Sequence, residues 1–356
     1  MKLMNSNPLI SIVMPAYNRA GVIRSAIESI IRQTYTNWEL IVVDDQSTDN
    51  TREVIEEIAK DDNRVHYIVN NRSKGPGGAR NSGMLHAKGE YLSFLDSDDE
   101  WYDCHLQDSI DTIQRTNVDV SFALWVEQHG TNIVRNFDKE VEQDLLNKMR
   151  KMNRVDGDAI LFNESLFEQF LLHTRNFFQL NTMMFKRELL ETYGLIDEQF
   201  YIGEDTTFII RFFDHCKIAL ITKPQSVYYQ SPDSVYFFCD RRQLEPDHLY
   251  QNEVLLNKFD ELGHRSIRVR MQIRDKVIKD KQLKNKKICL LNINIGIAKK
   301  YYTLSYLHRY NREKAIRYCR LSLKYKVSIF NLMLLARLFL SIKGGSGFLK
   351  KAVDLW

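Results

Sequence analysis

Short apolar segments alternate with amphipathic stretches over the first part of the chain. The apolar segments cover residues 10–14, 40–43, 65–69 and 91–95. Between them, apolar residues recur at helical spacing, as they do over 22–31 and 54–58. Continuously apolar strands that alternate with helices are typical of a parallel sheet covered on both faces. The pattern therefore predicts an α/β domain in which these segments are the first strands.

Beyond about residue 117 the pattern is mixed, and it later becomes helical. Residues 181–185 resemble a short strand, and 187–193 a helix that ends at Gly194. A second helix is predicted over 208–213, directly after a pair of carboxylates. The helical spacing from about residue 265 includes 301–326, which loosely resembles one tetratricopeptide-type helix pair. We therefore predict an α/β domain over 1–225, a connecting segment over 226–264 and a helical region over 265–356.

The formal net charge of +4 conceals a strong asymmetry between these parts. Residues 264–356 hold 23 Lys and Arg against 4 Asp and Glu, a net charge of +19, whereas residues 1–263 hold 27 against 42, a net charge of −15. The basic region is predicted to meet an anionic membrane surface, a polyanionic acceptor or an acidic protein surface, with a solvated helical face as the plain alternative. No nucleic acid is expected as a partner, because no recognisable binding module accompanies the charge.

Composition also predicts the compartment. The five cysteines are scattered, which is typical of free thiols in a reducing cytoplasm. The first residues show no signal-peptide pattern. The most apolar long segment, 327–342, is interrupted by Asn331 and Arg337, and a membrane span needs about 20 apolar residues. We therefore expect a cytoplasmic protein.

Polar residues follow three of the predicted strands, where each strand ends. They are Pro15-Ala16-Tyr17-Asn18, Asp44-Asp45 and Asp96-Ser97-Asp98-Asp99. In a parallel sheet, ligands bind outside the carboxyl ends of the strands, so these clusters are predicted to meet in one crevice. Asp96 and Asp98 point the same way on an extended segment. Mg²⁺ and Mn²⁺ prefer one or two carboxylates together with phosphate oxygens, whereas an isolated pair of this kind is more often a solvated acidic turn.

Other motifs are excluded. Gly75-Pro76-Gly77-Gly78 lacks the spacing of a dinucleotide-binding loop, because Arg80 stands where a third glycine is needed. No Gly-Lys-Ser/Thr phosphate loop is present, and the nine histidines show no metal-ligand spacing. A hydride-transferring enzyme and an ATPase are therefore disfavoured.

Five blocks in order make the chain resemble a known family over about residues 9–215. The blocks are 11–18, 40–49, 78–83, 96–99 and 203–205. They resemble the inverting family 2 glycosyltransferases, which have the GT-A fold: a Rossmann-like, mostly parallel sheet with helices on both faces. The resemblance implies a nucleotide-sugar half over about 1–115 and an acceptor half over 116–225. The basic helical region is then a C-terminal appendage.

The resemblance also implies a nucleotide-diphosphate sugar donor, most often a UDP sugar. The residues expected to hold this donor are Pro15, Ala16, Tyr17, Arg19, Asp44, Asp45, Gly78, Arg80, Asp96 and Ser97. Within this set, Asp45 is expected to accept a hydrogen bond from uracil, and Arg80 to reach the base or the phosphates. Mn²⁺ or Mg²⁺ is expected on Asp98, with Asp96 beside it, because charge builds on the diphosphate as it leaves. The acceptor side is expected to include Asp99, Trp101, Asn181 and Thr182.

A carboxylate must take the proton of the attacking acceptor hydroxyl. The resemblance assigns this role to Asp205, with Glu204 as the less favoured candidate; the plain alternative is a charge pair that stabilises a helix N-terminus. The chain departs from the family pattern in two places. After the acidic cluster the family often has Trp-x-Pro, whereas this chain has Trp101-Tyr102-Asp103, with Asp103 in place of the proline. Residues 230–234 lack the His or Arg that many relatives place near the phosphates.

We therefore expect a metal-dependent inverting hexosyltransferase or N-acetylhexosaminyltransferase. It would transfer a sugar to a bacterial surface glycan, wall polymer or lipid-linked acceptor, at the inner face of the cell membrane. The alternative is a non-catalytic glycan- or nucleotide-binding relative with the same fold. A nucleotidyltransferase is a more distant alternative, because 18–21 is too short for its glycine-rich loop.

Overall fold

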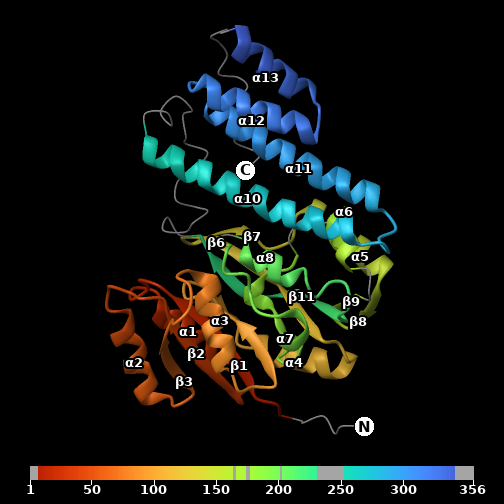
Figure 1. The fold of residues 1–356 in the computed structure, drawn as a ribbon. Coiled ribbons are helices and arrows are strands. Elements are labelled where there is room, and N and C mark those ends of the chain that lie inside the picture. Colours follow the sequence, from red (N-terminus) through yellow and green to blue (C-terminus); the bar gives the residue numbers. More distant parts are fainter. Residues whose placement is uncertain (1–6, 163–165, 174–176, 201–202, 231–251, 341–356) are drawn as a thin grey trace. The chain divides into compact units, whose positions relative to one another are not determined.

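The structure is a computed structural model, which describes residues 7–162, 166–173, 177–200, 203–230 and 252–340 (Figure 1). The chain divides into two compact units, residues 1–231 and residues 232–356. The phosphate-side segment that departs from the family pattern lies outside the described residues, except for Gln230. The four cysteines of the described residues are free thiols.

The first unit is built on a mixed 11-stranded sheet with the order β3-β2-β1-β4-β10-β6-β11-β9-β8, while β5 pairs with β11 and β7 with β6. The strands are β1 Ile10–Ala16, β2 Trp38–Asp44, β3 Val65–Val69, β4 Tyr91–Phe94, β5 Glu100–Trp101, β6 Val120–His129, β7 Asn132–Arg135, β8 Arg154–Asp156, β9 Ala159–Phe162, β10 Met184–Lys186 and β11 Ile218–Tyr229. Strands β3, β2, β1 and β4 are all parallel, as predicted, and β10 joins them to the other half by antiparallel pairing.

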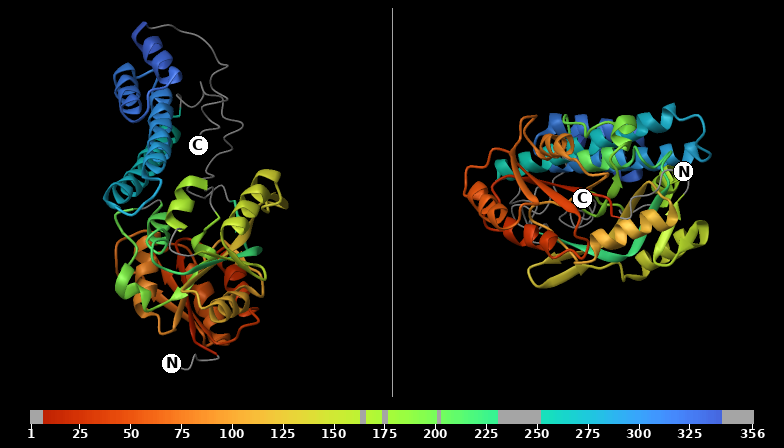
Figure 2. Two further views of the ribbon diagram at one scale, coloured as in Figure 1. Left: turned by 90° about the vertical axis from the view of Figure 1, so that its right-hand side faces the viewer. Right: turned by 90° about the horizontal axis from the view of Figure 1, so that it is seen from below.

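Helices cover both faces of this sheet (Figure 2). The helices of the first unit are α1 Ile23–Ile31, α2 Thr51–Asp61, α3 Pro76–His86, α4 His105–Thr116, α5 Glu140–Met152, α6 Leu166–His173, the 3₁₀ turn η1 Leu180–Thr182, α7 Leu189–Tyr193 and α8 Glu204–Ile209. Several boundaries differ from the prediction. The helix expected over 187–193 begins at Leu189, and the helical region expected from about residue 265 begins at Glu253, within the segment expected to be a connection. Residues 181–185 divide between η1 and β10, and the helix expected from residue 208 begins at Glu204. Gly203, with a φ of 76°, makes the turn into it, so that both carboxylates lie in the first turn, where the helix dipole favours them.

Alternate residues of β1 face opposite sides of the sheet and so meet different helices. Ile10, Ile12 and Met14 join a buried cluster with apolar residues of α1, α2 and α4. Val13 points to the other face, where α3 brings Gly83 against it. The continuous burial of β1 and β2 explains why their sequences show no polar alternation.

The second unit is helical, as predicted. It consists, within the described residues, of α10 Glu253–Lys279, α11 Lys286–Leu307, α12 Arg312–Tyr325 and α13 Ile329–Leu340, each packed on the next. The pair expected over 301–326 corresponds to the end of α11 and the whole of α12. Asn252 and Asn311 cap α10 and α12, because their side chains accept hydrogen bonds from backbone amides of the first turn. Among the described residues, no helix combines the length and the apolar character that crossing a bilayer requires.

A partly buried polar cluster ties α10 to α12. Asp260 accepts hydrogen bonds from His308 Nε2 at 2.7 Å, Lys314 Nζ at 3.1 Å and the Tyr318 hydroxyl at 3.1 Å. Burial raises the pKa of Asp260, but the hydrogen bonds from His308 and Lys314 outweigh this effect and lower it overall. These hydrogen bonds therefore fix how α10 is aligned against α12, in addition to the apolar contacts between the helices of the second unit.

The close approach of α3 to β1 predicts a stability defect in Gly83→Ala. An added Cβ would lie 2.3 Å from Val13 Cγ1, and this β-branched side chain is buried and cannot move aside. We expect the free energy of unfolding to fall by about 1–3 kcal/mol, measured by chemical denaturation followed by tryptophan fluorescence. The matched control is Gly21→Ala, because a Cβ there meets no described atom within 4 Å. Equal stability of the two variants would contradict this packing.

Candidate functional site

The polar residues that follow β1, β2 and β4 lie at one edge of the sheet. These strands are adjacent and parallel, so their carboxyl ends coincide. The amide of Asp45 donates to the carbonyl of Ala16 at 2.8 Å, and that of Leu95 donates to the carbonyl of Val13 at 3.3 Å. The sheet therefore brings the Tyr17, Asp45 and Asp96 segments together, as the sequence predicts.

The segment after β1 forms a fixed loop with an exposed aromatic ring. Tyr17 is 41% exposed, and Lys74 Nζ lies 4.6 Å from its ring centroid. Asn18 has a φ of 51°, and its side-chain oxygen accepts a hydrogen bond from the amide of Thr48 at 2.8 Å. The ring of Tyr17 is thus presented to solvent by a loop that is tied to the neighbouring segment.

Asp44 and Asp45 are buried and hydrogen-bonded within the protein. Asp45 accepts from Asn70 Nδ2 at 2.6 Å and from the amide of Gly75 at 2.7 Å. Asp44 accepts from the amide of Ser47 and, at 2.9 Å, from the hydroxyl of Tyr67. Burial, followed by this hydrogen bond, raises the pKa of Tyr67 to about 12. These carboxylates therefore shape the loops around the site, and hydrogen bonding of Asp45 to a base stays a prediction.

Asp96 and Asp98 are partly exposed at the end of β4. Arg19 pairs with Asp98 at 3.2 Å, and each of these two side chains is 27% exposed. Burial, and then the charge of Asp96, raises the pKa of Asp98, so the structure leaves its negative charge incompletely compensated. A divalent cation would relieve this repulsion, and the donor set of two carboxylates fits Mg²⁺ or Mn²⁺ that also binds phosphate. The described residues contain no group of three or more His, Cys, Asp or Glu side chains suited to holding a metal by themselves.

Arg80 joins the carboxylate cluster to the start of α8. It is 5% exposed, and it donates to Asp96 Oδ1 at 2.6 Å and to Glu204 Oε1 at 2.8 Å. Burial alone would lower the pKa of the guanidinium, but the charges of Asp96 and Glu204 raise it instead. A role of Arg80 in binding base or phosphate stays a prediction, since both terminal nitrogens have protein partners. No sequence pattern indicated this bridge, because its members come from distant segments.

The two carboxylates of α8 have different environments. Glu204 is buried, and burial, followed by the charge of Asp205, raises the pKa of Glu204 to about 7 while Arg80 opposes this shift. Asp205 is partly exposed, and one of its oxygens accepts a hydrogen bond from the amide of Thr206 at 2.6 Å. Of the two, only Asp205 is therefore accessible, and its second carboxylate oxygen makes no hydrogen bond or ion pair with the described residues.

A buried network lies directly behind Asp96. Asp99 accepts hydrogen bonds from Asn181 Nδ2 and, at 2.9 Å, from the amide of Tyr229, while Asn181 Oδ1 accepts from the amide of Asp96 at 3.2 Å. Trp101 Nε1 donates to the carbonyl of Asn181 at 2.6 Å. Burial, and then the charges of Asp98 and Asp96, raises the pKa of Asp99 well above its usual range. These side chains support the acidic cluster from inside.

The remaining predicted residues are close to the same edge. Ala16, Gly78, Ser97 and Thr182 are buried, and Pro15 is partly exposed. A Cβ on Gly78 would lie 1.9 Å from the carbonyl oxygen of Ser73, so only glycine lets this loop approach α3. An acceptor-side role for the buried Asp99, Trp101, Asn181 and Thr182 stays a prediction.

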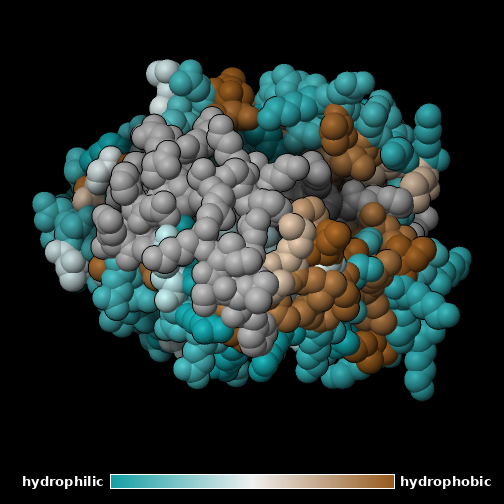
Figure 3. Space-filling view, turned by 90° about the horizontal axis from the view of Figure 1, so that it is seen from above, coloured by the Kyte–Doolittle hydropathy of each residue, from teal (hydrophilic) through white to brown (hydrophobic). Residues whose placement is uncertain are grey.

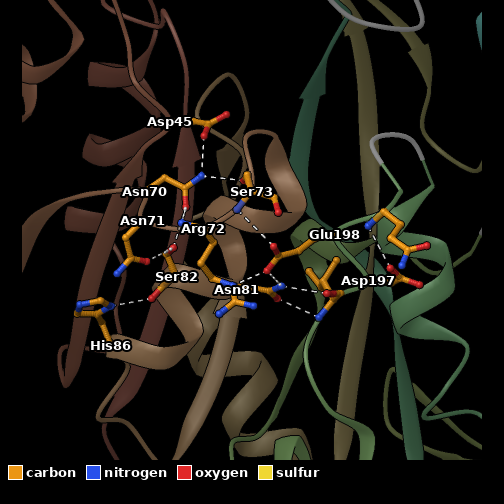
Figure 4. A network of polar contacts seen from close by, with 12 residues as sticks. Asp45, Asn70, Asn71, Arg72, Ser73, Asn81, Ser82, His86, Asp197 and Glu198 are labelled. Atoms are coloured by element: carbon orange, nitrogen blue, oxygen red, sulfur yellow. Dashed lines mark hydrogen bonds and ion pairs between the residues drawn. The ribbon is translucent and has the colours of Figure 1, made fainter.

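A second polar network, which the sequence did not reveal, surrounds Glu198 (Figure 4). Glu198 pairs with Arg72 and accepts hydrogen bonds from Asn81 Nδ2 at 2.7 Å and from the amide of Ser73 at 3.3 Å. Asn81 also exchanges two hydrogen bonds of 2.9 Å with the backbone of Ile196. The network fixes the loop at 70–75 to the segment before Glu204 and Asp205. In the sequence, only Asn81 pointed to this network, because it lies in the block 78–83 that resembles the family.

Comparison with known proteins identifies the family. The family model for "Glycosyl transferase family 2" matches residues 11–194. Staphylococcus aureus TarS 1-349 in complex with UDP-GlcNAc superposes with a TM-score of 0.59 at 17% identity, over 97% of this chain and 88% of that chain. A mannosyltransferase from Pyrobaculum calidifontis, in complex with GDP-Man and Mn²⁺, gives a TM-score of 0.52 at 16% identity, over 98% of this chain and 85% of that chain. The predicted GT-A fold with its helical C-terminal region is thereby confirmed.

Among proteins of assigned activity, the chain is 34% identical over 162 residues to an Escherichia coli enzyme, the UDP-Glc:alpha-D-GlcNAc-diphosphoundecaprenol beta-1,3-glucosyltransferase WfgD. The match covers 46% of this chain and 63% of that enzyme. The chain spans less than two thirds of the length of this and of other curated relatives that it matches.

The Glu198 network predicts a pH-dependent part of the stability. Burial raises the pKa of Glu198, but hydrogen bonds from Asn81, Arg72 and Ser73 outweigh it and lower the pKa to about 2 from an ordinary 4.5. This stabilisation is therefore present above about pH 4.5 and is lost as the pH falls towards 2.

We expect Glu198→Gln to lower the free energy of unfolding at pH 7 by about 1–3 kcal/mol and to flatten its dependence on pH below 4.5. Denaturant titrations at several pH values measure both effects. Glu57→Gln is the control, since the Arg24–Glu57 pair is largely exposed and should contribute less than about 1 kcal/mol. An unchanged acid dependence in Glu198→Gln would contradict the role of this network.

Proposed function

Because the chain belongs to glycosyltransferase family 2, we propose that it transfers a sugar from a nucleotide-diphosphate donor to a hydroxyl of a bacterial surface glycan, with inversion at the anomeric carbon. One observation carries the proposal. Arg80 holds Asp96, at the end of β4, and Glu204, at the start of α8, on the same guanidinium. Arg80 thus holds two carboxylate pairs at fixed relative positions. The pair of Asp96 and Asp98 suits a cation that also binds diphosphate, and the pair of Glu204 and Asp205 contains the carboxylate proposed below for proton transfer.

The donor is proposed to be a UDP sugar. Tyr17 offers an exposed aromatic face for a base, and the loop beside it is held by Asp45 and Asn70. Arg19 is placed to meet the diphosphate, because it pairs with Asp98 through a guanidinium that also suits phosphate oxygens. The UDP and GDP donors named for the solved neighbours and the UDP-Glc named for the Escherichia coli relative support a nucleotide donor.

Asp98, assisted by Asp96, is proposed to hold Mn²⁺ or Mg²⁺. When bound there, the ion would stabilise the negative charge that develops on the departing diphosphate. The raised pKa of Asp98 and the Mn²⁺ named for the Pyrobaculum calidifontis neighbour support this assignment.

Asp205 is proposed as the base that takes the proton of the acceptor hydroxyl. A base must be reachable and must have a free oxygen, and Asp205 is partly exposed. Glu204 is buried against Arg80, so its role is to position α8. One direct displacement with Asp205 as base inverts the anomeric configuration, and no covalent intermediate on the enzyme is needed.

The acceptor is proposed to be a lipid-linked or wall glycan at the inner face of the cell membrane. Diphosphoundecaprenol is named in the acceptor of the Escherichia coli relative. A lipid-linked acceptor would bring the enzyme to the membrane surface without a membrane-spanning helix. We place the transferred sugar among hexoses and N-acetylhexosamines, in keeping with the sugars named for these relatives and neighbours.

A donor-hydrolysis screen tests the function. The purified chain is incubated with UDP, GDP and dTDP sugars, with Mn²⁺ or with EDTA, and nucleotide release is measured. We expect release from one donor class in the presence of metal, and a decrease of about 10²–10⁴-fold in Asp205→Asn and in Asp98→Ala. Donor binding, measured by calorimetry, should persist in Asp205→Asn.

Asp61→Asn is the matched control, because Asp61 is exposed on α2 away from the strand ends. Donor binding without turnover, even with candidate lipid-linked acceptors, would favour the non-catalytic relative. Full activity of Asp205→Asn would refute the assignment of the base.

The bridge predicts a rate defect in Arg80→Lys. Lysine keeps the charge but cannot bond both carboxylates in the planar fork of a guanidinium. We expect a folded protein with a rate of transfer about 100-fold lower, because small displacements of reacting groups have effects of this size. Steady-state kinetics beside thermal unfolding measure this, with Arg24→Lys at an exposed pair as control. A wild-type rate in Arg80→Lys would show that the bridge does not position the site.

A further inference from the structure

Helix α13 is apolar on its outer face as well as on its packed face. Ile329, Leu332 and Met333 are 67%, 49% and 40% exposed, and Ala336 is also exposed. These positions follow the i, i+3, i+4, i+7 spacing, so they form one stripe along the helix. Figure 3 shows a hydrophobic area on the side of the molecule where Figure 1 draws α13. We call these four residues the apolar stripe.

The orientation of α13 is fixed, so the apolar stripe cannot turn inwards. Leu334 and Leu338 pack into a buried cluster with residues of α11 and α12. Asn331 is 5% exposed, and its side-chain amide donates to Ser322 Oγ at 2.7 Å and to the carbonyl of Lys326 at 3.1 Å. Rotation of α13 about its axis would bury the apolar stripe but would leave this amide without its acceptors, at a cost of roughly 1–3 kcal/mol. The outward position of the stripe is therefore specified by the polar contact of Asn331.

The segment that carries the apolar stripe has charges of one sign. Residues 314–340 contain 6 Lys and Arg and no Asp or Glu. Arg317, Arg320 and Lys324 are exposed on α12 and recur at spacings of three and four, so they share one face of that helix. An exposed apolar stripe and exposed cations on two successive helices, in a segment without Asp or Glu, are the composition of a segment that lies in a membrane interface.

We infer that α12 and α13 form a site that binds the surface of an anionic lipid bilayer. The apolar stripe enters the boundary between head groups and acyl chains, and the cations of α12 lie among the phosphate groups of the lipids. Each Lys or Arg near such a surface contributes ~1 kcal/mol, and the buried apolar side chains add to it. The site would keep the chain at the surface where we propose that its acceptor lies.

Charge and polarity favour a bilayer over other occupants. A second copy of the same surface would bring like charges together, which opposes a symmetric dimer through this face. A polyanionic glycan would satisfy the cations but would leave the apolar stripe in water. Only a lipid surface supplies phosphate groups and hydrocarbon side by side. The inference does not require turnover, so it can fail while the proposed function holds.

Vesicle flotation tests the site with the full chain. Vesicles of phosphatidylcholine alone are compared with vesicles that also contain phosphatidylglycerol. The apolar variant carries Ile329→Gln, Leu332→Gln and Met333→Gln, and the charge variant carries Arg317→Gln, Arg320→Gln and Lys324→Gln. The matched control carries Val254→Gln and Leu291→Gln, which are exposed apolar positions on α10 and α11. Circular dichroism verifies that each variant keeps its helices.

We expect wild type and control to float with the anionic vesicles and to remain at the bottom of the gradient when only neutral vesicles are present. Binding should fall by at least about tenfold in the apolar variant and in the charge variant, whereas donor hydrolysis in solution should be unchanged in both. A wild-type chain that does not float with anionic vesicles would overturn the inference.

Unchanged flotation of the apolar variant would overturn the inference as well. If that variant changed only the oligomeric state by light scattering, the face would belong to an interface between copies. If it changed only the unfolding temperature, the face would be covered by residues of the same chain. Binding to soluble polyphosphate but not to vesicles would assign the cations to a polyanionic acceptor.

Discussion

The site depends on one buried cation between two carboxylates. Among the described residues, Arg80 makes ion pairs with Asp96 and Glu204, which belong to segments that are distant in the sequence. Its pair with Glu204 is buried, and breaking a buried ion pair by removing one partner typically costs about 3–5 kcal/mol. The same contacts that stabilise Arg80 therefore set the distance between the acidic cluster after β4 and the start of α8. Stability and geometry of the site are determined together.

The rest of the first unit supports this arrangement. Parallel β2, β1 and β4 bring three loops to one edge, and the buried network of Asp99, Asn181 and Trp101 holds the backbone of Asp96 from inside. The Glu198 network fixes the segment before α8 to the loop at 70–75. The partly exposed Asp96, Asp98 and Asp205 are thus adjacent to buried polar contacts that specify where their backbones lie.

The sequence predicted what is local or periodic. Apolar runs located β1 to β4, and the rule for parallel sheets placed the ends of those strands at one edge. The bond between Arg80 and Glu204 joins residues that are 124 positions apart, and no periodicity connects them. The start of α8 was placed too late because Glu204 and Asp205 are charged, yet the turn at Gly203 and the helix dipole accommodate them in the first turn. The sequence also did not predict that the outer face of α13 is exposed. When apolar residues occupy every face of a helix, the pattern does not show which face is buried.

The contact between Arg19 and Asp98 bears on how fast the site can work. The backbone of Arg19 is anchored, since its amide donates to Thr51 Oγ1 at 2.7 Å, while its long side chain reaches Asp98 and stays partly exposed. Releasing Asp98 to another cation therefore requires only rotation about side-chain bonds, and exposed side chains rotate within picoseconds to nanoseconds. Typical enzymes turn over roughly 1 to 10³ times per second. Side-chain rotation at Arg19 is thus many orders of magnitude faster than such turnover, so releasing Asp98 from this pair would not limit the rate of the transfer proposed above.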